Sequence, residues 1–442
     1  MQKEAMNPFS RFLIVWAGQL ISSIGSGLTA FSLGVYAYQR THTATSFALI
    51  TLCSFLPSIL LRPLGGVLAD RFDRRRMMAL GDLGSAAGLV LIWLIMVTGH
   101  IELWQIYLGV TISSVFVALQ SPAYKASVTD LLTEEQFSRG SGLVQLASSS
   151  QYLLSPLIAG LLLGITDIKT ILALDIATFV IAVFAVLFIK KNLPEVRQEH
   201  ENQHFLKDLA EGWNTLTANR GVLFLIVIIS IVTFYIGLLQ TLLGPMVLSF
   251  ADAKTLGAAL SVSATGMLLS SLAIGVCNIT RKYADMLLAG LGFAGLFFAL
   301  MGLTTNIYII IAAGFLFFCA LPFINTSADV LIRKNIANDK QGRVWGIIGV
   351  LSQLGYVAAY SVAGFLADHV FNPLLNQGGF LAATVGRIIG TGRGRGIGLL
   401  LIISGLFVMV LAGITSGIRS IRALEVEWGA QDIPPDIANS KQ

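Results

Sequence analysis

Long apolar runs separated by short polar connections dominate the chain. A run of roughly 18 to 26 residues is the length that an α-helix needs to cross the hydrocarbon core of a bilayer. Such runs predict an all-α membrane protein with twelve transmembrane helices. They lie near residues 12–38, 45–69, 77–97, 104–122, 141–164, 170–189, 221–249, 256–277, 286–304, 306–327, 345–370 and 397–416.

The longest connection between runs falls midway along the chain and is rich in charged residues. It divides the twelve helices into two six-helix halves. The two halves are weakly similar in sequence, because a shift of 204 residues superposes Arg139 on Arg343. Duplicated halves with a site at their interface are a recurrent transporter plan. The predicted boundaries are 1–189 for the first half, 190–220 for the cytoplasmic linker, 221–416 for the second half and 417–442 for a cytoplasmic tail.

Composition and charge support lipid as the solvent. The chain is 55% hydrophobic and 12% charged, whereas soluble domains carry about 25% charged residues. A net charge of +5 would suggest nucleic acid in a soluble protein. Here 22 of the 29 Lys and Arg lie at the termini or in connections on the same side as the termini, and 6 lie on the opposite side. Positive charge marks the cytoplasmic side, which predicts a multi-pass plasma-membrane protein with both termini in the cytoplasm and no nucleic-acid partner.

Three ionisable residues lie well inside the predicted spans, away from their last few residues, where a charge is costly and therefore a functional candidate. Arg62 and Asp82 lie at similar depths, about 12 Å and 9 Å from the same rim at the helical rise per residue, which predicts an ion pair between them. Asp175 lies near the other end of the sixth helix. It either bonds to a neighbouring helix or carries a proton.

The connection after the second helix carries Gly66, Asp70, Arg71, Arg74 and Arg75 in the order G-x-x-x-D-R-x-x-R-R. This resembles the signature loop of the major facilitator superfamily, although Asp73 stands where that family usually has glycine. The resemblance implies the major facilitator fold, a small-molecule substrate, protons as coupling ion, no cofactor and a monomer.

The charged loop has two interpretations. Gly66 would let neighbouring helices approach, and Asp70 would accept bonds from a helix N-terminus or from arginines. With Arg139 and Arg343 the loop would then form a conformational latch. Alternatively, these arginines only set the topology.

Two further segments resemble parts of the superfamily. Ser155, Pro156 and Gly160 in the fifth helix look like the antiporter motif of its exporters, in which small residues and a proline allow close packing and a bend. The glycine-rich segment 372–398 is similar to the last external loop of the macrolide-efflux branch. Its glycine cluster lacks the Gly-Lys-Ser/Thr ending of a phosphate-binding loop, and we expect a flexible loop there that could include an interfacial amphipathic piece.

In the resembling fold, helices one, four, seven and ten line a central cavity. Uncharged polar groups among Phe and Leu suit a bulky amphipathic ligand. The alternative role of each glutamine is hydrogen bonding between helices. The candidate cavity residues are Gln19, Ser23, Ser114, Gln120, Gln151, Tyr235, Gln240, Asn325, Gln353 and Tyr356.

These features favour a secondary transporter, most simply a proton-coupled exporter of hydrophobic or amphipathic compounds such as macrolide-like antibiotics. A siderophore or metabolite exporter of the same fold remains an alternative. A membrane-embedded enzyme is disfavoured because no H-E-x-x-H motif, metal-site pattern or convincing G-x-S-x-G elbow is present. A non-transporting receptor stays open, and the sequence does not locate the proton carrier.

Overall fold

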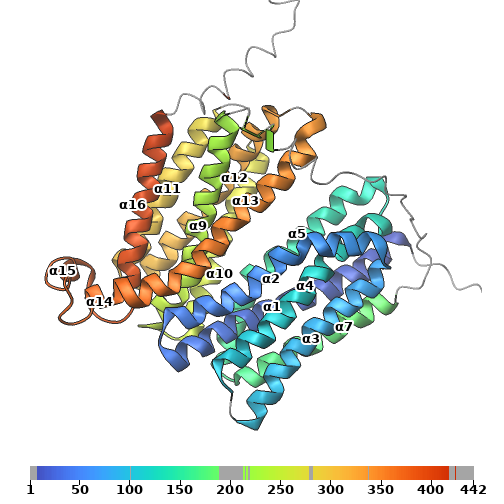
Figure 1. The fold of residues 1–442 in the computed structure, drawn as a ribbon, viewed down its shortest axis with the longest axis horizontal. Helices are drawn as coiled ribbons and strands as arrows, with labels where there is room; N and C mark the ends of the chain where they lie inside the picture. Colours follow the sequence, from blue (N-terminus) through green and yellow to red (C-terminus); the bar gives the residue numbers. More distant parts are fainter. Residues whose placement is uncertain are drawn as a thin grey trace, which may run out of the picture. The chain divides into compact units, whose positions relative to one another are not determined.

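The computed structural model describes residues 7–99, 101–188, 213–214, 216–217, 220–277, 282–336, 338–417 and 424 (Figure 1). Within them, 12 helical spans are long and apolar enough to cross a membrane, which confirms the predicted fold class. The predicted tail and most of the linker lie outside the described residues. The spans are α1 (Pro8–Thr41), α2 (Ala44–Arg71), α3 (Arg74–Thr98), α4 (Leu103–Leu131), α5 (Phe137–Leu153) with α6 (Ser155–Leu163), α7 (Ile168–Phe188), α9 (Arg220–Leu248), α10 (Ala253–Val276), α11 (Tyr283–Leu303), α12 (Ile307–Lys334), α13 (Asn338–Phe365) with the segments that follow it, and α16 (Arg395–Gly417).

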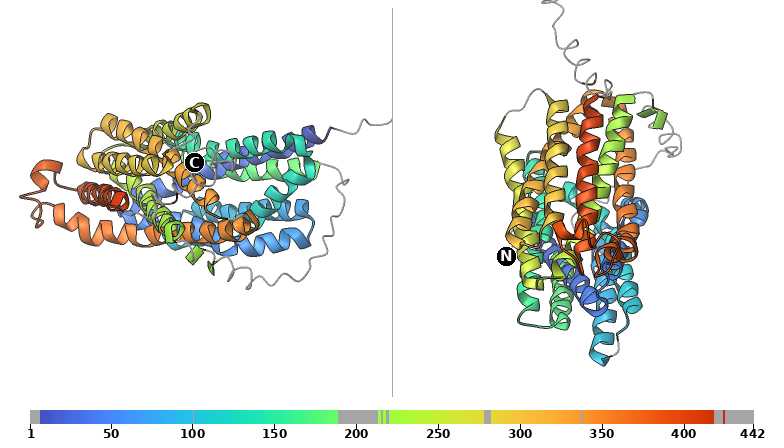
Figure 2. Two further views of the ribbon diagram at one scale, coloured as in Figure 1. Left: turned by 90° about the horizontal axis from the view of Figure 1, so that it is seen from above. Right: turned by 90° about the vertical axis from the view of Figure 1, so that its left-hand side faces the viewer.

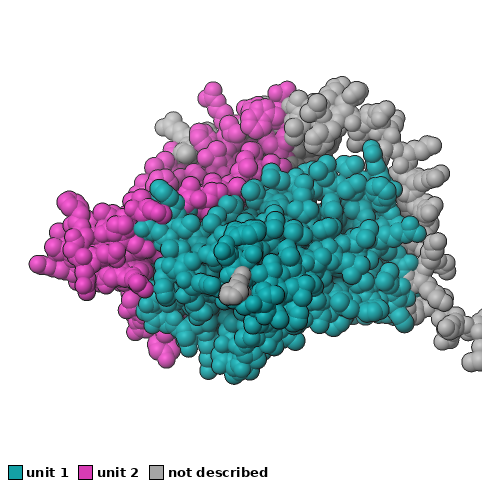
Figure 3. All heavy atoms as spheres, turned by 60° about the horizontal axis from the view of Figure 1, so that its bottom comes forward, with its two compact units in different colours: residues 1–199, 241–261, 363–368 teal, residues 200–240, 262–362, 369–442 magenta. Residues whose placement is uncertain are grey.

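The chain forms two compact units (Figure 3). Unit 1 comprises residues 1–199 together with 241–261 and 363–368. Unit 2 comprises residues 200–240, 262–362 and 369–442. The division does not follow the chain strictly, because the last part of α9, the start of α10, the end of α13 and the first residues after it belong to unit 1.

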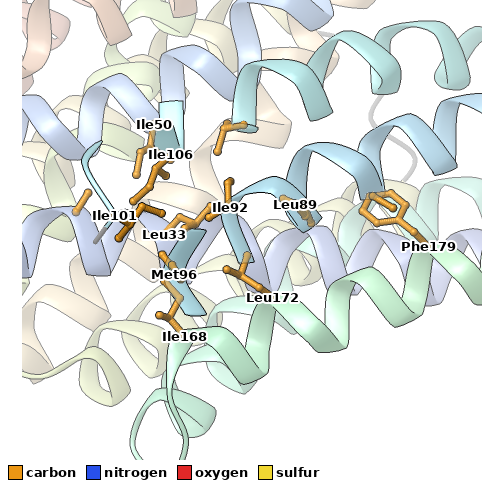
Figure 4. Close-up of a cluster of buried hydrophobic side chains, with 13 residues drawn as sticks. Leu33, Ile50, Leu89, Ile92, Met96, Ile101, Ile106, Ile168, Leu172 and Phe179 are labelled. Carbon is orange, nitrogen blue, oxygen red and sulfur yellow. The ribbon is translucent and has the colours of Figure 1, made fainter. Parts of the chain in front are cut away.

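Unit 1 has a core in which α3 packs against α4 and α7, and α1 packs against α7. Apolar side chains from five spans meet there, among them Leu33, Ile92, Ile106 and Leu172 (Figure 4). Glycines allow the closest approach. A Cβ built on Gly88 of α3 would lie 2.5 Å from the Gly109 carbonyl oxygen of α4. Small residues serve helix association in membranes in this way.

In unit 2, α11 packs against α12 and α16 (Figure 2). Two glycine pairs make the α11–α16 crossing tight. A Cβ on Gly295 would lie 2.7 Å from the Gly405 carbonyl oxygen, and one on Gly302 would lie 2.2 Å from the Gly398 carbonyl oxygen. Both units are therefore assembled by backbone-to-backbone packing of glycine-bearing helices.

Polar groups just outside the spans cap two of the helices. The Thr170 backbone N–H donates to Asp167 at 2.9 Å before α7, and the Thr255 backbone N–H donates to Asp252 at 2.8 Å before α10. Backbone and hydroxyl donation from Thr170 holds the pKa of Asp167 below its usual value. Hydroxyl and backbone donation from Thr255 lowers the pKa of Asp252. Both carboxylates therefore stay ionised and stabilise a helix N-terminus.

The glycine-rich segment after α13 differs from the expected flexible loop. A π-helix (Leu366–Phe371), α14 (Asn372–Leu375) and α15 (Gly386–Ile389) fold onto the start of α16. Leu375, Ile389 and Leu399 form a small buried core of their own. The segment closes because four glycines, at 378, 390, 392 and 394, take the positive φ that tight turns require.

Candidate functional site

Three buried polar side chains from three helices of unit 1 form a hydrogen-bonded chain. The Gln19 amide of α1 donates to the Asp82 carboxylate of α3 at 3.1 Å, and the Gln120 amide of α4 donates to the Gln19 carbonyl oxygen at 2.6 Å. The exposed fractions are 6% for Gln19, 2% for Asp82 and 8% for Gln120. The structure thus places a carboxyl group inside a transmembrane unit with neutral amides as its neighbours.

Small residues beside Asp82 on α3 allow this network to form. Gly81 precedes Asp82 on α3, and a Cβ there would lie 2.5 Å from the Gln120 Cβ. Gly81 therefore lets α4 approach closely enough for Gln120 to reach Gln19. Ser85, one turn further along α3, has its hydroxyl 2.9 Å from the Gly81 carbonyl oxygen and 3.2 Å from that of Ser113 on α4. Sequence analysis singled out all three network residues but did not join them.

The predicted Arg62–Asp82 ion pair is wrong. Asp82 is buried and bonds to Gln19, whereas Arg62 is exposed. Similar depth in the membrane does not fix the direction in which a side chain points. Arg62 lies on a face of α2 turned away from the interior of unit 1.

Asp175 of α7 is also fully buried in unit 1. The Thr178 hydroxyl is 3.2 Å from Asp175 Oδ1, while Asp175 Oδ2 has no hydrogen-bond partner. Gly25 of α1 lies against it, since a Cβ there would lie 2.6 Å from Asp175 Oδ1. Asp175 is thus wedged at the α1–α7 crossing, unlike Asp82 in its chain of amides.

The fifth span breaks at the antiporter-like motif. α5 ends at Leu153, and α6 starts at Ser155 with Pro156 in its first turn. The Leu157 backbone N–H donates to the Ser261 hydroxyl of α10 at 3.1 Å. The break therefore frees a backbone donor that α10 satisfies inside unit 1.

Glycines bring α6 and α10 together at this point. A Cβ on Gly160 would lie 2.7 Å from the Ala253 carbonyl oxygen, and one on Gly257 would lie 2.1 Å from the Pro156 carbonyl oxygen. The Ser155 hydroxyl donates to the Ile24 carbonyl oxygen of α1 at 3.0 Å. The three motif residues thus lie at a tight crossing of α1, α6 and α10.

A contact in unit 1 that sequence analysis missed involves Asp368 of the π-helix. Its carboxylate accepts hydrogen bonds from the Ala44 backbone N–H at 3.0 Å and the Thr45 backbone N–H at 2.8 Å. The Thr45 hydroxyl donates to it at 2.7 Å. Thr43, the residue before α2, makes no side-chain cap of its own. Asp368 therefore caps α2 from a position more than 300 residues away, and no local signal could have revealed it.

At the other end of unit 1, the charged loop ties helices together through Arg74. Its guanidinium forms an ion pair with Asp130 at 2.7 Å and donates to the Ala126 carbonyl oxygen at 3.1 Å. The Arg75 guanidinium donates to the Val186 carbonyl oxygen near the end of α7 at 3.5 Å. Arginine is suited to such multiple bonds because its donors form a rigid fork.

The remaining loop residues fall into different environments. Asp73 accepts bonds from the Arg75 and Arg76 backbone N–H groups and caps α3 with a φ of −57°, so glycine is not required there. No atom lies within 4 Å of a Cβ on Gly66, whereas one on Gly65 would lie 2.4 Å from the Ala118 carbonyl oxygen. Gly65, and not Gly66 as predicted, is the close-packing glycine.

The other predicted latch residues are only partly described. Arg71 is exposed, and Arg139 lies over the Phe9 ring at 5.1 Å. The side chains of Asp70 and Arg343 lie outside the described residues.

Unit 2 presents a different polar chemistry along α9 and α13. The Tyr360 hydroxyl of α13 hydrogen bonds to the Gln240 carbonyl oxygen of α9, and the Tyr356 ring lies 6.0 Å from that of Tyr360. Tyr235 lies 6.3 Å from Phe298 of α11 and 5.7 Å from Phe407 of α16, measured between ring centroids. In the described part of unit 2, no carboxylate is among the buried side chains.

The other candidate cavity residues have separate environments within their own units. The Ser114 hydroxyl donates to the Ser54 carbonyl oxygen of α2 at 2.6 Å, which is the helix-packing role. Asn325 is exposed, and Ser23, Gln151 and Gln353 are half-buried. Across the described ranges, no group of three or more His, Cys, Asp and Glu is arranged to hold a metal ion.

Comparison with known proteins decides the family. The family model described as Major Facilitator Superfamily matches residues 15–360. The chain belongs to this superfamily. The resemblance carried by the loop after α2 is thereby confirmed, and the chain is a multi-pass membrane transporter by family.

Among relatives, Macrolide efflux protein A of Streptococcus pyogenes is 25% identical over 366 residues, which is 81% of this chain and 90% of that protein. The Staphyloferrin A transporter of Staphylococcus aureus is 23% identical over 77% of this chain and 83% of its own length. A crystal structure of the nucleoside transporter NupG matches with a TM-score of 0.73 at 14% identity, covering 92% of this chain and 98% of that one. That structural match concerns the fold alone.

Proposed function

We propose that this superfamily member is a proton-coupled exporter of hydrophobic or amphipathic compounds, with macrolide-like antibiotics as one class, and that Asp82 carries the proton. The observation behind this proposal is the buried hydrogen-bonded chain that runs from Gln120 through Gln19 to Asp82. A carboxyl group inside the membrane is costly, and acids retained there commonly serve proton pathways. The chain has no other described buried acid with a hydrogen-bonded link to two further helices.

Neutral amides suit a carboxyl group that changes protonation state. The Gln19 amide donates to the ionised Asp82, and the same amide can offer its carbonyl oxygen to a protonated carboxyl group after turning over. That turn would break its bond from Gln120 and so shift α1 against α4. A proton entering a cell gains about 2.3 kcal/mol per 100 mV of membrane potential, which is the driving force that export needs.

The substrate class follows from the side chains around Gln240 and Tyr235 in unit 2. They are amides, phenols and phenyl rings, which bind apolar surface and a few hydroxyl groups. The relatives named for macrolide efflux support the same class. We also propose that both termini face the cytoplasm, that the charged loop acts as a latch through Arg74 and Asp130, and that the protein works as a monomer without catalytic activity.

A siderophore or other metabolite is the second candidate substrate, favoured by the relative named for staphyloferrin A transport. A strongly anionic ligand would call for basic side chains at the site. The buried cation among the described residues is Arg395, and it is engaged by the Gly302 and Thr304 carbonyl oxygens. An uncharged or cationic amphiphile therefore fits better.

The direct test is accumulation of a radiolabelled macrolide in energised cells with and without the protein, before and after a protonophore is added. Lower accumulation that the protonophore abolishes supports proton-driven efflux. Unchanged accumulation in cells that demonstrably contain the protein in their membrane contradicts the macrolide assignment, and siderophore export is then measured in the same cells.

A further inference from the structure

The compact segment between α13 and α16 leaves two large apolar side chains outside its own core. Phe380 is 86% exposed and Ile388 is 82% exposed. Their neighbours Leu381 and Ile389 pack inward with Leu375. The segment therefore sorts its apolar residues into an inner group and an outer pair.

The backbone of this segment is held in place, so the outer pair is presented on a defined scaffold. The Gly392 backbone N–H donates to the Leu375 carbonyl oxygen at 2.9 Å, and the Leu381 N–H donates to the Leu374 carbonyl oxygen at 3.0 Å. At Gly396 a Cβ would lie 2.3 Å from the Asn372 backbone nitrogen, which locks the segment against the start of α16.

Basic charge accompanies the exposed apolar pair. Residues 376–394 contain Arg387 and Arg393 and no Asp or Glu. Both arginines are exposed, and neither forms an ion pair with a described residue. Arg395, close to them in sequence, is buried, and its guanidinium donates a hydrogen bond to the Gly302 carbonyl oxygen at the end of α11. The two arginines of this stretch are therefore exposed and form no ion pair with any described residue, whereas Arg395 is buried.

The segment connects two spans, and this position indicates that its outer face meets the membrane surface. The eleventh span ends at Leu375 and the twelfth begins at Arg395, so both ends of the segment lie at the boundary of the membrane. In Figures 1 and 2, α14 and α15 extend sideways from the ends of α13 and α16. Side chains there meet the headgroup region, where aromatic rings and basic residues are favoured.

We propose that residues 376–394 form an interfacial anchor, in which Phe380 and Ile388 enter the acyl boundary of the adjacent leaflet while Arg387 and Arg393 bind the phosphates of acidic phospholipids. The apolar pair sets how deeply the segment inserts into the membrane, and the arginines make it prefer negatively charged lipids. This proposal does not depend on the transported compound.

The test uses the whole protein in proteoliposomes with Cys53, Cys277 and Cys319 replaced by Ala, and an environment-sensitive fluorophore on Phe380→Cys. Thr305→Cys, exposed in the connection between α11 and α12, is the control label. Quenching by doxyl lipid and by aqueous iodide is measured with and without phosphatidylglycerol. We expect the label at 380 to be quenched by doxyl lipid and to resist iodide about threefold better than the control label.

The arginines are tested in the same system. Arg387→Gln with Arg393→Gln should remove the effect of phosphatidylglycerol, whereas Arg40→Gln, an exposed arginine in the last turn of α1, should leave it unchanged. Equal iodide access at 380 and at 305 in both lipid mixtures would overturn the anchor. Protection at 380 that appears only at high protein density, with energy transfer between labelled copies, would also overturn it in favour of a second copy of the chain.

Discussion

The two units have the same kind of helical architecture but carry different polar chemistry. Unit 1 buries Asp82 in a chain of amides and Asp175 at a helix crossing. The described part of unit 2 buries no acid and instead gathers Tyr235, Tyr360 and several phenyl rings. In the function proposed above, this difference corresponds to a division of labour, in which unit 1 handles the proton and unit 2 recognises the apolar substrate.

Removal of the carboxyl charge in unit 1 should have the largest effect. Asp82→Asn keeps the size of the side chain and a donor–acceptor pair, so the protein should insert normally, while gradient-driven efflux should fall by about a hundredfold. Efflux rates in cells with matched protein levels check this. The control is Asp285→Asn, an exposed acid at the start of α11 in unit 2. Equal losses of efflux in Asp82→Asn and Asp285→Asn would contradict a special role for the buried acid of unit 1.

The amides of the network should follow with smaller losses. Gln19→Ala and Gln120→Ala each remove a hydrogen bond in a chain that ends on a charge, which corresponds to about a tenfold loss of efflux rate. Because the two side chains are bonded to each other, the double variant should lose less than the product of the single losses. Gln353→Ala, whose side chain makes no described hydrogen bond, should retain nearly full activity. Multiplicative losses for Gln19 and Gln120 would show that they act separately.

Changes in unit 2 should alter which compound is exported and leave proton coupling intact. Tyr235→Ala removes a ring that contacts Phe298 and Phe407, and we expect KM for a macrolide to rise about three- to tenfold. Tyr360→Phe removes the bond to Gln240 and should have a smaller effect in the same direction. Transport kinetics at several pH values provide the measurement. A changed pH profile in either variant would contradict the division of labour.

The smallest expected effect concerns the ion pairs at the ends of the spans. Arg74–Asp130 in unit 1 is 2.7 Å long with side chains 27% and 23% exposed, whereas Arg333–Asp329 in unit 2 is 3.7 Å long with side chains 61% and 51% exposed. Double-mutant cycles with Gln and Asn should give a coupling of about 0.5 to 1 kcal/mol in thermal stability for the first pair and none for the second. Equal coupling energies for Arg74–Asp130 and Arg333–Asp329 would contradict the expectation that only the ion pair of unit 1 adds stability.

The sequence sufficed for the spans and the family because both rest on local signals. Apolar run length placed all twelve helices, and the residues around Arg74 identified the superfamily. It also found Gln19, Asp82 and Gln120 as single residues. It could not join them, because the rotation of a helix about its axis depends on packing glycines such as Gly81 and Gly65, and sequence spacing alone does not reveal their partners.

Three cases illustrate this limit. Similar depth predicts a pair of Arg62 and Asp82, yet their side chains point in different directions. Asp368 gives no local signal, because its partners, Ala44 and Thr45, are distant in sequence. Glycine permits many conformations, which predicts flexibility in the segment after α13. Here the same freedom allows positive φ at tight turns that close a small core.

Purified protein in proteoliposomes separates substrate binding from proton coupling most directly. Exchange of labelled for unlabelled macrolide at equal pH on both sides requires no net proton movement, whereas accumulation driven by an imposed pH gradient does. For Asp82→Asn the account predicts exchange close to that of the unaltered protein and no gradient-driven accumulation. Gradient-driven accumulation that survives in Asp82→Asn would contradict the assignment of the proton to unit 1.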